Sequence, residues 1–150
     1  MIKKARLSHT DQIYEIISSF AKKELLLPRS KPDIYEHIRD FFVWEENDKI
    51  LGCSALHIVW QNLGEIRSLA VRDENQNDGI GRELVLSCLN EARELGLKEV
   101  FALTYVPSFF EKLGFCLIDK HQLPRKIWTD CVNCPYFPDC KEQAVIIKIN

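Results

Sequence analysis

The sequence predicts a single domain, spanning 1–150, of the α/β (α+β) class: a sandwich in which about four helices flank a mixed sheet of seven strands. Three observations predict it. Some segments repeat apolar residues every three or four positions, and others alternate or are continuously apolar. The two patterns follow one another in the order β-α-α-β-β-β-α-β-α-β-β, without repeats or a linker. Finally, Glu65–Arg93 reads as a strand, a turn with two glycines and an amphipathic helix.

The chain is predicted to begin with a strand and a helix. Ile2–Leu7 alternates loosely, as a short strand does. Thr10 can cap a helix that ends near Glu24, before Pro28, because a proline pushes its predecessor toward extended geometry. The apolar side chains of this helix recur at helical spacing: Ile13, Ile16, Ile17, Phe20 and Ala21.

A second helix and a hairpin are expected next. Ser30 can cap the helix, with Pro32 tolerated in its first turn. Strands over 42–46 and 50–61 then form a hairpin around the turn Asn47-Asp48-Lys49. The residues expected to face inward from the second helix are Ile34, Ile38, Phe41 and Phe42.

The second half continues with a strand over 65–72 and a long helix that Gly96 ends as a C′ residue. The helix carries one apolar stripe: Ile80, Leu84, Val85, Cys88, Leu89, Ala92 and Leu95. The remaining elements are expected to be a strand over 100–104, a helix over 107–113, and strands over 115–118 and 144–149.

Composition narrows the function classes. The chain is 46% hydrophobic and 28% charged, with a formal net charge of −2, so it lacks the basic footprint of a nucleic-acid partner. No apolar run approaches the roughly 20 residues of a membrane span, and no apolar signal-peptide core follows the first lysines. We therefore expect a cytoplasmic protein without a membrane partner. Cys53, Cys88 and Cys116 fall in apolar patterns and are expected to be buried thiols.

The glycine turn predicts an anion site. Gly79 and Gly81 leave the backbone bare where the helix begins, and the first N–H groups of a helix have no intrahelical partner. Such a terminus suits a phosphate or pyrophosphate, and Gln76 and Arg82 add side-chain donors. The turn is not a dinucleotide fingerprint, because Leu84 stands where a third glycine is needed.

The stretch Val71–Arg82 resembles the acetyl-CoA motif of the GNAT acyltransferase superfamily, Gln/Arg-x-x-Gly-x-Gly/Ala, through Gln76, Gly79 and Gly81. The order of elements along the whole chain resembles this family too. The resemblance implies a three-layer sandwich with a mostly antiparallel sheet, and acetyl-CoA as the co-substrate of an N-acetyltransferase. The cofactor-binding positions that it implies are Leu69, Ala70, Val71, Gln76, Asn77, Asp78, Gly79, Ile80, Gly81 and Arg82.

Charged residues stand on the strand before the turn. Because side chains alternate along a strand, Glu65, Arg67, Leu69 and Val71 are expected to share one face. One interpretation is an ion pair or a solvated strand end. The other is catalytic: Glu65-Ile66 resembles the Glu-Ile stretch that supplies the general base in several GNAT enzymes, and Arg67 would grip a carboxylate of the acceptor.

The sequence differs from the family pattern at the position expected to donate a proton to the CoA thiolate. Many GNAT members carry a tyrosine in the helix before the Gly-Phe pair, where this chain has Phe110, which cannot donate a proton. Tyr105 is a possible substitute, and packing at the rim is its alternative role. The thiolate could also take its proton from water, because a thiol titrates near pH 8.5.

Four segments resemble the short stand-alone N-acetylglutamate synthase type, which implies L-glutamate as the acceptor and the first step of arginine biosynthesis. They are LLPRS at 26–30, EIRSLAV at 65–71, LTYVPSFFEKLGF at 103–115 and LPRKIWTDCVNCPYFPDC at 123–140. Arg29, Arg67, Arg125 and Lys126 could meet the two carboxylates, although each alone could be a surface cation. The alternatives are another amine, such as a polyamine or a protein N-terminus, or a non-catalytic CoA-binding regulatory module.

A cysteine- and proline-rich insert at about 119–143 separates the last two predicted strands. Cys131, Cys134 and Cys140 have the spacing C-x₂-C-x₅-C, in which C-x₂-C is a common zinc half-site. The fourth ligand of a structural zinc could be His121, Cys116, Asp139 or a residue of a partner chain. Reduced cysteines packed in a loop, and redox or iron–sulfur roles, are the alternatives. A homodimer is left open.

Overall fold

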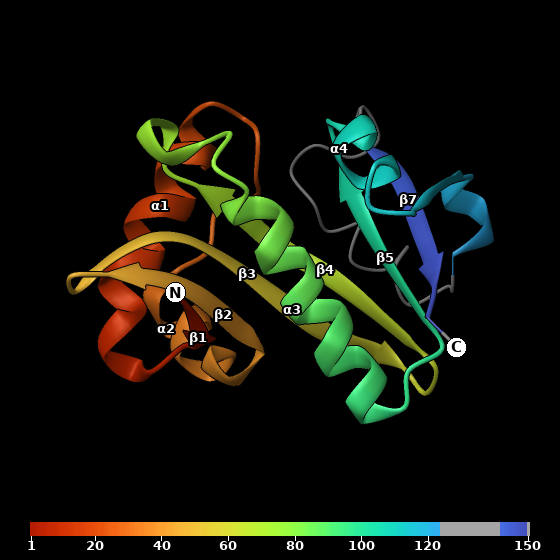
Figure 1. The fold of residues 1–150 in the computed structure, drawn as a ribbon, viewed down its shortest axis with the longest axis horizontal. Helices are drawn as coiled ribbons and strands as arrows, with labels where there is room; N and C mark the ends of the chain where they lie inside the picture. Colours follow the sequence, from red (N-terminus) through yellow and green to blue (C-terminus); the bar gives the residue numbers. More distant parts are fainter. Residues whose placement is uncertain (124–141, 150) are drawn as a thin grey trace.

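Helices cover both faces of a seven-stranded sheet in the computed structural model, which describes residues 1–123 and 142–149 (Figure 1). The sheet order is β1-β2-β3-β4-β5-β7-β6, and β4 and β5 are parallel while the other neighbours are antiparallel. The predicted fold class is therefore confirmed. The strands are β1 (Ile2–Lys4), β2 (Phe41–Glu46), β3 (Lys49–Trp60), β4 (Leu63–Val71), β5 (Glu99–Thr104), β6 (Cys116–Ile118) and β7 (Gln143–Lys148).

Four α-helices lie within the described residues. In Figure 1, α3 crosses in front of β3 and β4, and it is the central helix of its face. The α-helices are α1 (Thr10–Lys22), α2 (Lys31–Glu36), α3 (Ile80–Leu95) and α4 (Pro107–Glu111). The short 3-10 helices are η1 (Leu7–His9), η2 (Ile38–Asp40), η3 (Asp73–Asn75) and η4 (Lys120–Gln122).

Each face of the sheet has its own apolar core. The core on the α3 side joins the α3 stripe to Leu56 and Ile66 of the central strands. The core on the other side joins α1 and α2 to β2 and β3, and a smaller cluster around Phe101 continues that side toward β7. Alternation along each strand divides the residues between the two faces.

The second helix is shorter than the sequence suggested. It ends at Glu36, and Phe41 and Phe42 belong to β2. Phe41 fills the core under α1 and Phe42 fills the core under α3, as alternate residues of a strand do. Their spacing from Ile34 and Ile38 also fits a helix, which is why the sequence suggested that they face inward from the second helix. That expectation was wrong, because both residues face inward from a strand.

Two details of the helix ends also differ. The first helix begins at Thr10 with His9 as its N-cap, and among the described residues the buried Thr10 hydroxyl has no hydrogen-bond partner. Leu95, in the last turn of α3, is 60% exposed, although its position in the helical repeat is that of the buried stripe. Gly96 ends α3 in the left-handed conformation, as predicted. Within the described residues, no helix is both long and apolar enough to cross a membrane.

Candidate active site

The central strands β4 and β5 separate where the predicted motif lies. Their ladder joins residues 63–66 to residues 99–102, whereas β4 extends to Val71 and β5 to Thr104. Figure 1 shows the two strands diverging toward their carboxyl ends, with the start of α3 beside β4 and α4 beside β5. Backbone groups of β4 beyond Ile66 lie outside this ladder. An extended ligand can bind such an edge as an added strand would.

A bulge interrupts β4 at this point. Residues 53–55 of β3 face residues 67–70 of β4, so three residues oppose four. Ser68 takes the extra place with a φ of 55°, in the left-handed region that residues other than glycine seldom adopt. The bulge bends the strand and changes which side chains face each way.

The bulge overturns one expectation from the sequence. Glu65 and Arg67 share a face, as predicted, and they lie on the side of α1 and α2 with Ala70. Leu69 and Val71 instead pack into the core on the α3 side. The extra residue shifts the alternation by one, so these four residues do not share one face.

Glu65 and Arg67 form an ion pair on that face. Glu65 is 7% exposed, and Arg67 Nε donates to its Oε1 at 2.5 Å. The ion pair that one interpretation predicted is thus present. A carboxylate and a guanidinium thus lie together where β4 leaves β5, and the catalytic interpretation stays a prediction.

Arg29, from the apolar loop before α2, reaches the same part of β4. Its Nη donates to Ser68 Oγ at 3.2 Å, its Nε donates to Asp33 at 2.7 Å, and its side chain is only 13% exposed. Burial raises the pKa of Asp33, but the hydrogen bond and charge of Arg29, together with His37, lower it further, to below its ordinary value. The structure therefore brings Arg29 to the strand of Glu65 and Arg67. Arg125 and Lys126 lie outside the described residues.

The glycine turn adopts the conformation that the sequence predicted. Gly79 caps α3 with a φ of 82°, and open space lies where its side chain would be. The amide of Gln76 donates to Val71 O at 3.0 Å, so this side chain closes the loop from within. Arg82 is exposed and pairs with Glu83 at 3.8 Å. The first amides of α3 have no intrahelical carbonyl to bind, which suits an anion.

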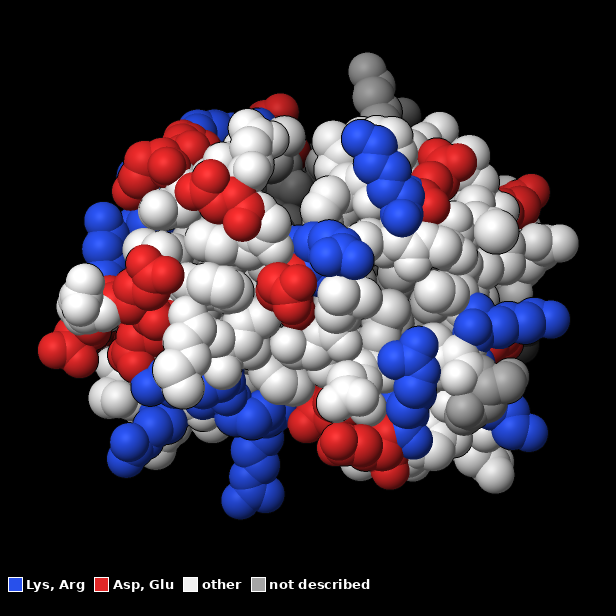
Figure 2. Space-filling view, viewed as in Figure 1, with Lys and Arg blue, Asp and Glu red and all other residues white. Residues whose placement is uncertain are grey.

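The surface over α3 carries both signs of charge. Figure 2 shows lysines and arginines interspersed with acidic residues on this face, with neither sign forming a continuous patch. An anionic ligand at the start of α3 therefore depends on backbone amides and the helix dipole more than on a broad positive surface.

Tyr105 and Phe110 have different environments. Tyr105 is half-buried and comes directly after β5, beside the opening of the strands. Phe110 is buried in α4 and packs edge-to-face against Phe109 and Phe115, each at 5.1 Å between centroids. Phe110 is therefore a core residue, and its side chain has no hydroxyl group that could donate a proton.

Sequence reasoning missed several polar residues of this face. Ser68 carries no sequence signal for its conformation, and Asp33, in the first turn of α2, carries none for its pairing with Arg29. His57 and Asp40 form a pair with 3.3 Å between Nδ1 and Oδ2, and His57 is the cross-strand partner of Glu65. Alternation along β3 could have placed His57 on this face, but the pairing with Glu65 needs the register of two strands.

The cysteines divide into two groups. Cys53 donates its thiol to Ser68 O at 3.4 Å, and Cys88 lies 3.3 Å from Ser54 Oγ. Burial raises the pKa of both thiols to about 12. Cys116 is exposed on the short edge strand β6, so the expectation that it is buried was wrong.

The proposed zinc ligands Cys131, Cys134, Cys140 and Asp139 lie outside the described residues. Within 1–123 and 142–149, no three metal-binding side chains come together. His121 is exposed and pairs with Asp119 at 2.8 Å. The zinc site stays a prediction.

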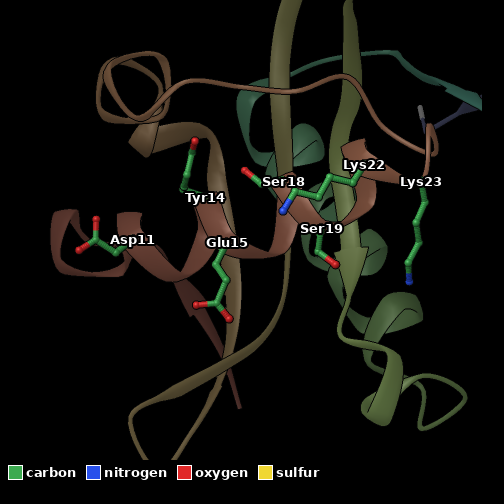
Figure 3. A pocket seen from close by; sticks show the side chains of 7 residues that line it. All are labelled: Asp11, Tyr14, Glu15, Ser18, Ser19, Lys22 and Lys23. Atoms are coloured by element: carbon green, nitrogen blue, oxygen red, sulfur yellow. The ribbon is translucent and has the colours of Figure 1, made fainter.

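A hollow of about 610 Å³ lies away from this site, along the outer face of α1. Figure 3 shows that its seven lining side chains all come from α1 and the residue after it. Two of them pair across to the segment after β4, Glu15 with Arg72 at 2.8 Å and Lys23 with Asp73 at 2.8 Å. One helix and its ion pairs do not form a ligand site.

A family model described as the acetyltransferase (GNAT) family matches residues 10–115. The chain belongs to the GNAT acetyltransferase family. This GNAT protein is 42% identical over 145 residues to an uncharacterized N-acetyltransferase of Chlorobaculum tepidum, a match that covers 97% of the chain and 94% of the relative. It is 38% identical over 133 residues to an amino-acid acetyltransferase of Mycobacterium tuberculosis, covering 87% and 76% of the two chains. It is an N-acetyltransferase.

Solved structures agree with the family. A Mycobacterium tuberculosis protein in complex with CoA and a second molecule superposes with a TM-score of 0.84 at 29% identity, covering 99% and 98% of the two chains. The N-acetylglutamate synthase of Neisseria gonorrhoeae, complexed with coenzyme A and N-acetyl-glutamate, gives a TM-score of 0.89 at 25% identity. The GNAT chain is covered completely there but spans only 35% of that longer synthase.

The buried thiols allow a test of whether solvent reaches the residues packed against the β4 bulge, where Cys53 contacts Ser68. In the native protein, Cys53 and Cys88 should react with iodoacetamide at pH 8 at least about 100-fold more slowly than Cys116, because the thiolate is the nucleophile and burial suppresses it. Pulse alkylation followed by peptide mass spectrometry measures each rate. Labelling of Cys53 at the rate of Cys116 would contradict its burial against the bulge. In the control, the same experiment in denaturant should expose all three thiols to the reagent.

Proposed function

We propose that this GNAT enzyme transfers the acetyl group of acetyl-CoA to the α-amino group of a small amino acid, with L-glutamate as the acceptor. The proposal rests on one observation: the buried carboxylate of Glu65 lies beside Arg67, at the point where β4 leaves β5, and Arg29 binds Ser68 on the same strand. A carboxylate can take a proton from an ammonium group. Two guanidinium groups suit an acceptor with carboxylates.

Acetyl-CoA would bind mainly to backbone. Its pyrophosphate would lie at the start of α3, where Gly79 leaves open space beside the amides of residues 80–82. Its pantetheine arm would lie along residues 69–71 of β4, in the place of a missing strand. These amides can also polarise the thioester carbonyl, which accumulates negative charge when the amine attacks.

The chemistry follows from these positions. Glu65 removes a proton from the acceptor ammonium, directly or through a water, so that a neutral amine attacks the thioester carbon. The carbon–sulfur bond breaks, and CoA leaves as a thiolate. Tyr105, at the end of β5, or water then supplies the proton to the thiolate sulfur. A thiol titrates near pH 8.5, so the thiolate is an acceptable leaving group.

The acceptor is the finer part of the proposal. Relatives of this chain include an amino-acid acetyltransferase, and one similar structure is an N-acetylglutamate synthase with N-acetyl-glutamate bound. Acetylation of glutamate would make this the first step of arginine biosynthesis. A polyamine would meet Arg29 and Arg67 as like charges, which disfavours that alternative. Arg125, Lys126 and a zinc-stapled insert remain predictions for the segment after η4.

A panel of acceptors tests the proposal. Release of CoA from acetyl-CoA should be fastest with L-glutamate. It should be weaker with aspartate, whose two carboxylates are one methylene closer together, and with glutamine, which carries only one carboxylate. A thiol reagent measures the released CoA, and polyamines and short peptides serve as competing acceptors. Fast release with polyamines or peptides, but not with amino acids, would refute the acceptor and leave the enzyme class intact.

Replacement of the base should slow the chemical step. Glu65→Gln should lower kcat by about 10²- to 10⁴-fold, the usual contribution of a general base. Acetyl-CoA affinity should change little, because the cofactor contacts are backbone. Calorimetry and steady-state kinetics measure the two effects, and a thermal melt checks folding. A variant that folds and retains full kcat over the pH range would remove Glu65 from catalysis.

Removal of the Arg67 guanidinium beside Glu65 should weaken binding of the acceptor instead. Arg67→Ala should raise the KM for glutamate by at least about tenfold, since a charged hydrogen bond contributes roughly 1.5–3 kcal/mol. The matched control is Arg93→Ala, on the exposed face of α3. Equal KM values in the two variants would place Arg67 outside the acceptor site.

A further inference from the structure

A histidine faces Glu65 from the neighbouring strand. His57 of β3 is the Cα partner of Glu65 in β4, and opposed residues of antiparallel strands have Cβ atoms about 5 Å apart on the same face. Ala55, two residues before His57, belongs to the core on the side of α1 and α2, which is the side of the ion pair. An imidazole therefore lies next to the carboxylate to which we assign the role of general base.

Asp40 of η2 orients this imidazole. His57 Nδ1 lies 3.3 Å from Asp40 Oδ2. A carboxylate accepts hydrogen bonds and cannot donate one when ionised, so Nδ1 carries the proton and the lone pair is on Nε2. The carboxylate also stabilises the charge when Nε2 accepts a second proton. The pair thus has the arrangement that prepares a histidine to accept a proton.

The imidazole is more exposed to solvent than the carboxylate of Glu65. The side chain of His57 is 29% exposed, whereas the residue Glu65 is only 7% exposed. His57 also meets the ring of His37 edge-on, with 5.9 Å between centroids. Among residues 1–123 and 142–149, the charged and titratable groups around His57 include Asp40 from η2, His37 at the end of α2, and Glu65 and Arg67 from β4.

We infer that His57, positioned by Asp40, carries the proton taken up by Glu65 to solvent in each catalytic cycle. This inference rests on the proposed function. A proton leaves the acceptor nitrogen for the Glu65 carboxylate; the new O–H bond then breaks as an N–H bond forms at His57 Nε2; and the imidazolium gives the proton to water or buffer. An imidazole suits this step because it gains and loses protons near neutral pH.

The test is chemical rescue. His57→Ala should lower kcat by about 10²-fold, at the lower end of what proton-transfer groups contribute, with little change in the KM for acetyl-CoA. Imidazole added to the assay should restore the rate in proportion to its unprotonated form, because it can occupy the partly exposed space that the side chain leaves. His57→Gln keeps a polar contact with Asp40 and serves as the second variant if His57→Ala folds poorly. It should also lose about 10²-fold in kcat, because an amide does not accept the proton as an imidazole does.

The positioning role of Asp40 has its own control. Asp40→Asn should reduce kcat and change its pH dependence between pH 6 and 8, where imidazoles titrate. Asp119→Asn removes a comparable aspartate–histidine contact on the exposed η4, and it should leave both unchanged.

Two results would overturn the relay: an unaltered kcat and pH profile in folded His57→Ala, or a loss of rate that imidazole does not restore. The measurements use whichever amine the unaltered enzyme acetylates fastest. Failure of glutamate as acceptor thus counts against the proposed substrate, and only the His57 variants decide the relay.

Discussion

The backbone of Ser68 is the constraint on which the site depends. Its left-handed conformation costs a residue other than glycine roughly 1–2 kcal/mol, and contacts from two other elements hold it. Cys53 of β3 donates to its carbonyl, and Arg29 from the loop before α2 donates to its hydroxyl. The ladder between β4 and β5 ends two residues earlier, at Ile66. One extra residue in one strand thus accompanies the opening of the central sheet.

The two halves of the site use different kinds of recognition. The half at the start of α3 consists of backbone amides, brought close by Gly79 and Gly81, so its ligand contacts depend little on side-chain identity. The half on the side of α1 and α2 consists of side chains from several elements. In the function that we propose, specificity for the acceptor would depend on Glu65, Arg67 and Arg29, and binding of acetyl-CoA would depend mainly on backbone groups.

Charges on the face of β4 that carries Glu65 and Arg67 alternate in sign and hold one another in place. Arg67 pairs with Glu65, Arg29 pairs with Asp33, and Asp33 also pairs with His37. Each group keeps a fixed partner before any ligand binds, which lowers the entropic cost of presenting a charged site. An acceptor carboxylate would join this network in place of water. Pre-organisation of this kind would favour selective binding of the small acceptor that we propose.

The sequence by itself determined the order of elements, the glycine-bounded helix and the shared face of Glu65 and Arg67. Each depends on neighbours within a few residues, where periods of 2 and 3.6 and the conformational freedom of glycine decide the outcome. Tertiary structure decided that Leu69 and Val71 turn to the opposite face, that His57 faces Glu65, and that Cys116 is exposed. Strand register, bulges and edges arise from pairing between distant segments, and a local pattern of apolar residues carries no information about which residues pair.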